Sequence, residues 1–367
     1  MILKNHNTKK QHWLFRMRLF MAATVFAVFS LNMPGVANAA DTVRVGHFSW
    51  PGYGFHYVAE AEKLTDLKFD NTIIEDPVQL FSLLSTNQLD VVFSTIEFGP
   101  IAAAEEMGFK LINLSNLAHG SDKIVVHPDI KEAADLKGKQ VAILEGGLSH
   151  IMMGIWLQQN GVKYDEVQMV NLIAGDAAAA MISGQVAAAE LWAPFNQQVL
   201  DDLAGSRTVA DSFDPYWLQT ALIADAIYMS SDFLENHRET AVKALQAIYA
   251  GVEFWRSNAE KSNKIIAEAV GFSVDDVSAI LGNGKLTRDA ANNDPKDGEL
   301  YIYSLEDAAR FCGVADGDPP FGQKNGQLKD HWELTNDWWI NFGFITKRGD
   351  YTAGTDCNLV KEALAGS

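Results

Sequence analysis

The strongest constraint on the fold is a regular alternation of short apolar stretches with amphipathic ones. Strands are expected at residues 43–47, 69–74 and 90–93, and helices at 56–63 and 77–86 between them. A chain that repeats strand and helix in this way builds a mostly parallel sheet with helices on both faces. The pattern continues to about residue 191, so the expected fold class is α/β.

Ligands of such sheets bind beyond the carboxyl ends of strands, and three segments are so placed: 48–55, 94–98 and 115–121. The first combines aromatic residues with glycines and includes Trp50 and Tyr53. Glycine lets a ligand approach the backbone closely, and aromatic rings supply rigid apolar walls. A binding loop and a packed turn at a domain edge both fit these residues.

A second α/β unit is expected from about residue 121. Its strand at 140–144 leads into Gly146-Gly147-Leu148-Ser149-His150, which opens a helix. Backbone N–H groups at a helix start attract a carboxylate, sulfonate, phosphonate or nitrate. An ordinary serine N-cap is the alternative interpretation of Ser149.

The first 39 residues have the pattern of a secretory signal peptide. Basic residues and no acidic ones precede an apolar run at 19–31, and Ala37-Asn38-Ala39 offers a small-residue cleavage site. The run is shorter than the ~20 residues that span a bilayer. No cysteine lies at the cleavage site, so we expect a soluble periplasmic product without a lipid anchor.

The remaining chain, residues 40–367, is too long for one compact core, and two domains are expected. The whole chain carries a net charge of −18, and removal of the basic leader makes it more negative. Such a surface repels nucleic acid and anionic lipid, so neither is an expected partner.

Two cysteines, Cys312 and Cys357, are the only ones in the sequence. In an oxidising compartment they are expected to form a disulfide, with two free thiols as the alternative. The sequence has no C-x-x-C, no H-E-x-x-H and no P-loop, and Gly147-Leu148-Ser149-His150-Ile151 lacks the last glycine of a nucleophile elbow. No catalytic residues, metal ligands or cofactor are therefore expected.

Several short motifs, taken in order, resemble the periplasmic solute-binding proteins of ABC importers. The resemblance is to the nitrate, sulfonate and taurine group, which also holds carriers of thiamine-precursor pyrimidines and riboflavin. The motifs are Val43-Arg44-Val45-Gly46 with Trp50-Pro51-Gly52-Tyr53, Gln88-Leu89-Asp90-Val91-Val92-Phe93-Ser94-Thr95, Leu136-Lys137-Gly138-Lys139-Gln140-Val141-Ala142, Gly146-Gly147-Leu148-Ser149-His150, Ala174-Gly175-Asp176-Ala177, Met181-Ile182-Ser183-Gly184-Gln185-Val186-Ala187-Ala188, and Phe342-Gly343-Phe344-Ile345 with Asp350 and residues 359–364.

The resemblance implies a type II periplasmic-binding-protein fold with a ligand cleft between two lobes. Lobe 1 would hold residues 40–120 and 225–367, and lobe 2 would hold 121–224. Closure of the lobes around the ligand would allow a monomer to dock on a membrane permease driven by a cytoplasmic ATPase.

The same resemblance supplies the expected ligand-binding residues by motif position. They are Trp50, Tyr53, Ser94, Thr95, Gly147, Ser149, His150, Asp176, Glu190, Trp192 and Asp225. Structural roles compete with binding at some of them: Asp176 suits a helix N-cap, Trp192 a core position, and Asp225 a pair with a buried Lys or Arg. Glu97 suits the first turn of a helix, and neither His119 nor His150 is expected to bind metal.

Helix starts and hydroxyls favour an anionic group, whereas Glu190 and Asp225 beside tryptophans favour an ammonium. Together they suit a zwitterion such as taurine. A cationic or aminopyrimidine ligand and nitrate are the alternatives, because Glu190 and Ala187-Ala188-Ala189 depart from typical members. A ligand sensor for a membrane receptor is a further alternative. An enzyme of the thiamine-pyrimidine synthase type, which acts inside cells, is disfavoured by the leader.

Overall fold

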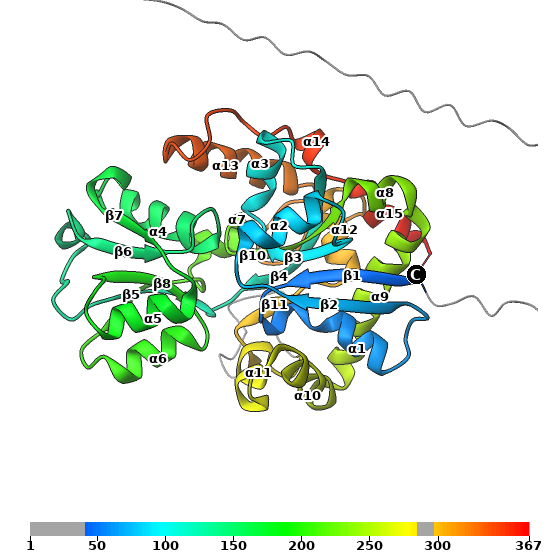
Figure 1. Cartoon of the computed structure of the whole chain (residues 1–367), viewed down its shortest axis with the longest axis horizontal. Coiled ribbons are helices and arrows are strands. Elements are labelled where there is room, and N and C mark those ends of the chain that lie inside the picture. The colour runs from blue at the N-terminus through cyan, green and yellow to red at the C-terminus, as the bar shows by residue number, and fades with distance from the viewer. Residues whose placement is uncertain (1–40, 285–296, 367) are drawn as a thin grey trace, which may run out of the picture. The chain divides into compact units, whose positions relative to one another are not determined.

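A computed structural model describes residues 41–284 and 297–366. The expected leader at residues 1–39 lies outside this part. Two sheets with helices around them make up the described chain (Figure 1). No described helix is both long enough and apolar enough to cross a membrane.

The first sheet has six strands in the order β11-β4-β10-β3-β1-β2. Their bounds are β1 Thr42–His47, β2 Lys68–Ile73, β3 Val91–Thr95, β4 Phe109–Ala118, β10 Ala224–Ser230 and β11 Leu300–Ile302. The second sheet has the order β7-β6-β8-β5-β9. Its strands are β5 Asp122–Val126, β6 Gln140–Ile143, β7 Gln168–Asn171, β8 Ala188–Trp192 and β9 Arg207–Asp211.

Both sheets are mixed, whereas the sequence predicted mostly parallel ones. Strand β1 pairs in parallel with β2 and β3, and β6 does so with β7 and β8. The remaining pairs are antiparallel, because the chain leaves the first sheet after β4, enters the second at β5, and returns through β10 between β3 and β4. The changes of sheet fall at residues 119–121 and 212–223.

The helices cover both sheets. Their bounds are α1 Phe55–Ala61, α2 Pro77–Ser85, α3 Phe98–Ala104, α4 Leu148–Gln159, α5 Ala174–Ile182, α6 Phe195–Asp202, α7 Pro215–Thr220, α8 Ser231–Asn236, α9 Arg238–Ser257, α10 Ala259–Val270, α11 Val274–Leu281, α12 Leu305–Cys312, α13 Leu328–Asn341, α14 Tyr351–Gly354 and α15 Cys357–Ala365. Helix α2 begins with proline as predicted, and Asp76 caps it by accepting from the N–H groups of Val78 and Gln79.

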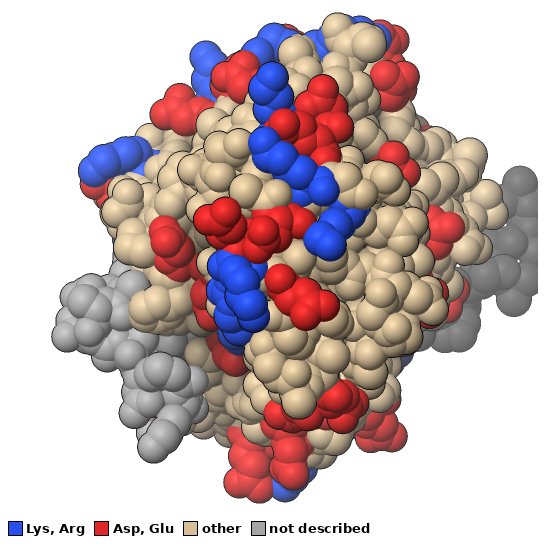
Figure 2. Space-filling model, turned by 90° about the vertical axis from the view of Figure 1, so that its left-hand side faces the viewer, with Lys and Arg blue, Asp and Glu red and all other residues tan. Residues whose placement is uncertain are grey.

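Helix α9 has an apolar face. Leu245, Ile248, Val252 and Trp255 are buried, and α1 packs closely against this helix at Gly251. A disulfide joins Cys312 at the end of α12 to Cys357 at the start of α15, with 5.7 Å between the Cα atoms. Figure 2 shows the face at the left of Figure 1, where Lys and Arg side chains form a band among Asp and Glu. The acidic side chains on that face therefore do not form one continuous patch.

Candidate functional site

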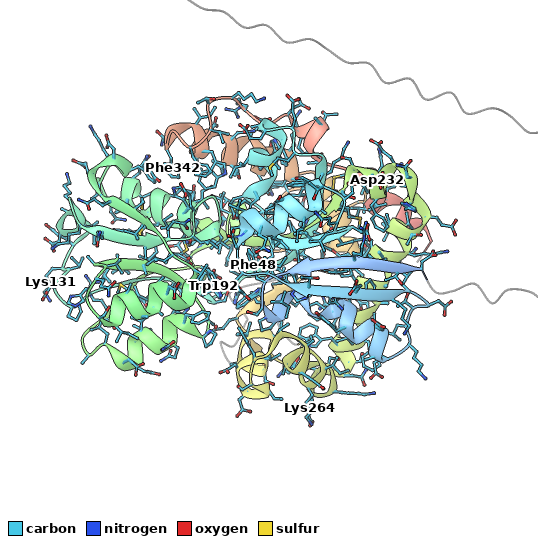
Figure 3. All side chains as sticks on the ribbon, viewed as in Figure 1. Phe48, Lys131, Trp192, Asp232, Lys264 and Phe342 are labelled. Carbon is cyan, nitrogen blue, oxygen red and sulfur yellow. A yellow bond between two sulfur atoms is a disulfide. The ribbon has the colours of Figure 1, made fainter. Side chains whose placement is uncertain are left out.

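A cavity of about 240 Å³ is lined by residues from both sheets. The loop after β1 contributes Phe48, Ser49, Trp50 and Tyr53 to its wall. The second sheet contributes Asp122 from β5 and Trp192 from β8. Figure 3 shows Phe48 and Trp192 between the elements of the first sheet and those of the second. Glu75, Thr95, Asn116, Ala118, Leu144, Leu148, Ser149, Ile173, Ala174, Gly175, Phe195, Ile223, Ala224, Asp225 and Leu300 complete the lining.

Asp225 joins the aromatic loop to the strands of the first sheet. It lies on β10, opposite Thr95 of β3 and Asn116 of β4. Its carboxylate accepts hydrogen bonds from Trp50 Nε1 at 3.0 Å and from the Tyr53 hydroxyl at 2.7 Å. The alternative of a Lys or Arg partner is therefore not what the structure shows. Burial raises the pKa of Asp225 to about 7, although these donors favour its charged form.

Three further carboxylates are buried near Asp225. Glu97 precedes α3, Asp122 begins β5, and Glu190 lies on β8, and they are 0, 5 and 2 % exposed. Burial raises the pKa of Asp122 to about 7. The Ser121 hydroxyl donates a hydrogen bond to this carboxylate, which lowers the pKa but does not offset the effect of burial. Burial also raises the pKa of Glu97 and of Glu190, and the negative charge of Asp122 adds to both effects.

Glu190 has no hydrogen-bond partner for either carboxylate oxygen within residues 41–284 and 297–366. On β8 it lies two residues before Trp192, which is opposite Asp122 in the register with β5. Side chains two apart on a strand point to the same face of the sheet. Glu190 therefore faces the same side as two residues that line the cavity.

The starts of two helices also line the cavity. Leu148 and Ser149 belong to the first turn of α4, and Ala174 and Gly175 to that of α5. No side chain caps either helix start. The Ser149 hydroxyl accepts a hydrogen bond from the Leu144 N–H at 2.5 Å, so it holds the loop between β6 and α4.

Six of the expected ligand-binding residues line the cavity: Trp50, Tyr53, Thr95, Ser149, Trp192 and Asp225. The other five do not. Ser94 and Glu190 are buried behind the wall, and Gly147 is the N-cap residue of α4. His150 accepts from the Gly146 N–H and bonds the Tyr164 hydroxyl, so it stabilises the turn, and burial lowers its pKa to about 4.

Asp176 is not the N-cap residue that the sequence offered as its alternative role, and its expected contact with a ligand stays a prediction. It is exposed in the first turn of α5, outside the lining of the cavity, and the N-cap residue is Ile173. Glu75 and Asp122 line the cavity but were not predicted from the sequence, whereas Phe48 and Asn116 lie within the expected segments 48–55 and 115–121. An acidic residue two positions before the apolar run at 124–126 of strand β5 was the signal for Asp122.

The charged residues that line the cavity are acidic. Glu75, Asp122 and Asp225 line it, and no Lys, Arg or His is among the described residues that do so. Nor does the described part of the chain hold a group of three or more His, Cys, Asp or Glu placed to bind a metal ion. The arrangement suits a small organic molecule that contacts aromatic rings and carboxylates.

The sequence of this chain is similar to those of two bacterial proteins. A protein of Brucella abortus (strain 2308) described as a binding protein is 24% identical over 323 residues, 86% of this chain and 98% of that protein. The taurine-binding periplasmic protein of Escherichia coli (strain K12) is 27% identical over 195 residues, 51% of this chain and 59% of that protein.

Solved structures share the fold. The alkanesulfonate-binding protein SsuA from Xanthomonas axonopodis pv. citri, bound to MOPS, superposes with a TM-score of 0.64 at 16% identity, covering 87% of this chain and 99% of that one. The desulfurization enzyme DSZB does so with a TM-score of 0.59 at 14% identity, covering 89% and 99%. The model of the family described as "NMT1/THI5 like" matches residues 70–262, just over half of the chain. The chain therefore belongs to the NMT1/THI5-like family.

Proposed function

We propose that this protein is the extracytoplasmic solute-binding component of an ABC uptake system, and that taurine or a related zwitterionic sulfonate is its ligand. The observation that carries the proposal is one cavity whose wall combines helix starts from α4 and α5 with buried carboxylates and tryptophans. Helix starts suit the sulfonate, and carboxylates with indole rings suit the ammonium. The names of the taurine-binding relative and of the SsuA structure agree with this ligand class.

Lobe closure is the proposed means of capture. The chain changes sheet at residues 119–121 and 212–223, close to the expected limits of lobe 2 at 121 and 224. A third link is made where α13 reaches α4: Asn341 donates to Gln158 Oε1 at 2.9 Å, and Phe342 packs on Gly154. Rotation about these links would open the cavity to solvent and close it over the solute.

The partners follow from this role. The signal-peptide pattern at residues 1–39 and the periplasmic relatives support export to a periplasm, without a lipid anchor. A closed monomer would deliver its solute to an inner-membrane permease, with the ATPase acting indirectly. Sensing for a membrane receptor would use the same cavity.

An enzyme is the second class of function. DSZB shows that this fold can carry catalysis. In this chain the Ser149 hydroxyl is bonded to the backbone of Leu144, and no histidine is among the described residues of the cavity wall. The serine therefore lacks the neighbouring base that a nucleophile requires, and we propose binding without chemistry.

A thermal-shift screen tests the proposal. The full chain would be expressed in a bacterial host and the protein purified from the periplasmic fraction in a buffer without sulfonates. Taurine, alkanesulfonates, nitrate, aminopyrimidines, riboflavin and choline-type amines would be added separately. A ligand that binds only the folded state raises the Tm. At a concentration one hundred times its Kd, such a ligand stabilises the fold by about 2.7 kcal/mol. A shift with any of them supports solute binding, and no shift with any of them contradicts it.

A further inference from the structure

The buried carboxylates around the cavity come from separate elements of both sheets. Asp225 lies on β10 and Glu97 before α3, while Asp122 and Glu190 lie on β5 and β8. Each is at least nine-tenths buried. Taking a carboxylate out of water is costly unless donors or a positive charge compensate it.

The compensation within the protein is incomplete. Asp225 accepts from Trp50 and Tyr53, and Asp122 accepts from the Ser121 hydroxyl. Glu190 accepts from no described residue, although it is buried and faces the side of the sheet where Trp192 and Asp122 line the cavity.

Lys123, a basic side chain whose charge acts on Asp122, is held by other groups. Its Nζ donates to the Gly120 carbonyl at 2.6 Å and lies 3.8 Å from Glu299. Lys123 also interacts with Asp211. Because side chains alternate between the two faces of a strand, Lys123 points to the face of the sheet opposite to that of Glu190. No described Lys, Arg or His lines the cavity to balance Glu190, Asp122 and Asp225.

We infer that the cavity selects a small organic cation, an ammonium or guanidinium group whose N–H donors are received by the Asp122 and Asp225 carboxylates of the wall and whose charge is attracted by the Glu190 carboxylate buried beside it. This inference rests on the proposed solute-binding function and deepens it, because it makes the amine, and not the sulfonate, the required part of the ligand. Trp50 and Trp192 add ring faces against which a cation is stabilised. A sulfonate alone would bring a further negative charge beside three carboxylates.

Matched ligands test the inference. Isothermal calorimetry at pH 8 would compare taurine with isethionate, which replaces the ammonium by a hydroxyl, and with ethanolamine, which replaces the sulfonate by a hydroxyl. Choline, guanidine and agmatine would extend the cationic set. We expect at least one cationic compound to bind, and taurine, if it binds, to do so at least 100-fold more tightly than isethionate.

The variant Glu190→Gln keeps the side-chain volume and removes the charge. We expect it to weaken binding of the cationic ligand at least 10-fold while the Tm of the free protein stays unchanged or rises, since an unpaired buried charge is removed. Asp232→Asn, a remote carboxylate on α8 (Figure 3), is the matched control and should leave binding unchanged.

Failure of this inference differs from failure of the proposed function. Equal affinity for taurine and isethionate, or binding by sulfonates while no amine or guanidinium compound binds, overturns the cation requirement and leaves solute binding intact. If no compound that carries an ammonium or guanidinium group binds, taurine included, the inference is also overturned. Binding by ethanolamine or guanidine without taurine supports the cation requirement and replaces taurine as the ligand.

Discussion

The indole Nε1 of Trp50 donates a hydrogen bond to Asp225 Oδ2 at 3.0 Å, although 175 positions separate the two residues in the sequence. The contact ties the loop after β1 to the strand through which the chain returns to the first sheet. It places an aromatic ring and a buried carboxylate side by side in the cavity wall. Ligand binding should therefore be sensitive to either residue.

Replacement of either cavity tryptophan tests that sensitivity. Trp50→Phe removes a donor to a buried carboxylate, and we expect the affinity for the bound solute to fall by about 1–2 kcal/mol. Trp192→Phe should reduce the ligand-dependent change in tryptophan fluorescence. Trp338→Phe, on α13 and outside the cavity lining, is the control. If both cavity variants keep the fluorescence change and the affinity, neither tryptophan lines the ligand site.

The titration of Asp225 predicts a pH-dependent effect of Asp225→Asn on the ligand-free protein. The pKa of Asp225 is raised by burial to about 7 from 3.8, with Asp122 and Glu97 as the facing negative groups. A raised carboxyl pKa stabilises the fold below the unfolded pKa, and this contribution is lost as the pH rises through 7.

Asparagine does not titrate, so the stability of the variant relative to the wild type should increase from pH 5 to pH 8, by up to about 3 kcal/mol. Chemical denaturation at both pH values measures this difference. Parallel stability profiles would show that the Asp225 carboxyl is not protonated in the free protein.

The disulfide between Cys312 and Cys357 holds α12 against α15, which in turn packs on α9 and β4. It closes a loop with a sequence separation of 45 residues, for which chain entropy suggests about 4 kcal/mol. The double variant Cys312→Ala and Cys357→Ala should lower the Tm accordingly. Thiol labelling of the unreduced, unfolded wild type should give no product, and labelling of both cysteines would contradict the bond.

Gly251 of α9 provides a test of the packing between α9 and α1. A Cβ atom at this position would lie 2.0 Å from the carbonyl oxygen of Phe55 on α1. Gly251→Ala must therefore push the two helices apart, and we expect a loss of about 3 kcal/mol in the free energy of unfolding. Glu253→Ala, on the exposed face of the same helix, should change it by less than about 0.5 kcal/mol. Similar effects of the two substitutions would contradict the close contact.

The periodic apolar stretches predicted β1, β3 and β6 well, because most residues of these strands are buried. Strand β4 was expected to end at residue 114, yet it continues to Ala118 through Ser115 and Asn116. These polar residues end the apolar run, but the backbone goes on pairing with β10 and β11. The antiparallel pairs depend on where the chain returns, and residue spacing does not contain that information.

The site was predictable where a residue ends a strand within a recognisable loop, as for Trp50, Tyr53 and Trp192. Glu97 and Asp122 were less visible, because a carboxylate at the start of a helix or strand usually faces water. Here both are buried because elements of the two sheets meet at the cavity. That meeting is a property of tertiary structure, so the acidic character of the cavity emerged only from the coordinates.

Amide hydrogen exchange with and without saturating ligand tests the central claim most directly, using whichever compound the thermal-shift screen identifies. Amides in peptides covering residues 47–54 and 222–227 of the first sheet, and 120–125 and 188–193 of the second, should gain protection together, because a solute held between the sheets suppresses opening on both sides. Protection confined to one sheet, or found only in peptides outside the cavity wall, would contradict a ligand site between the two lobes.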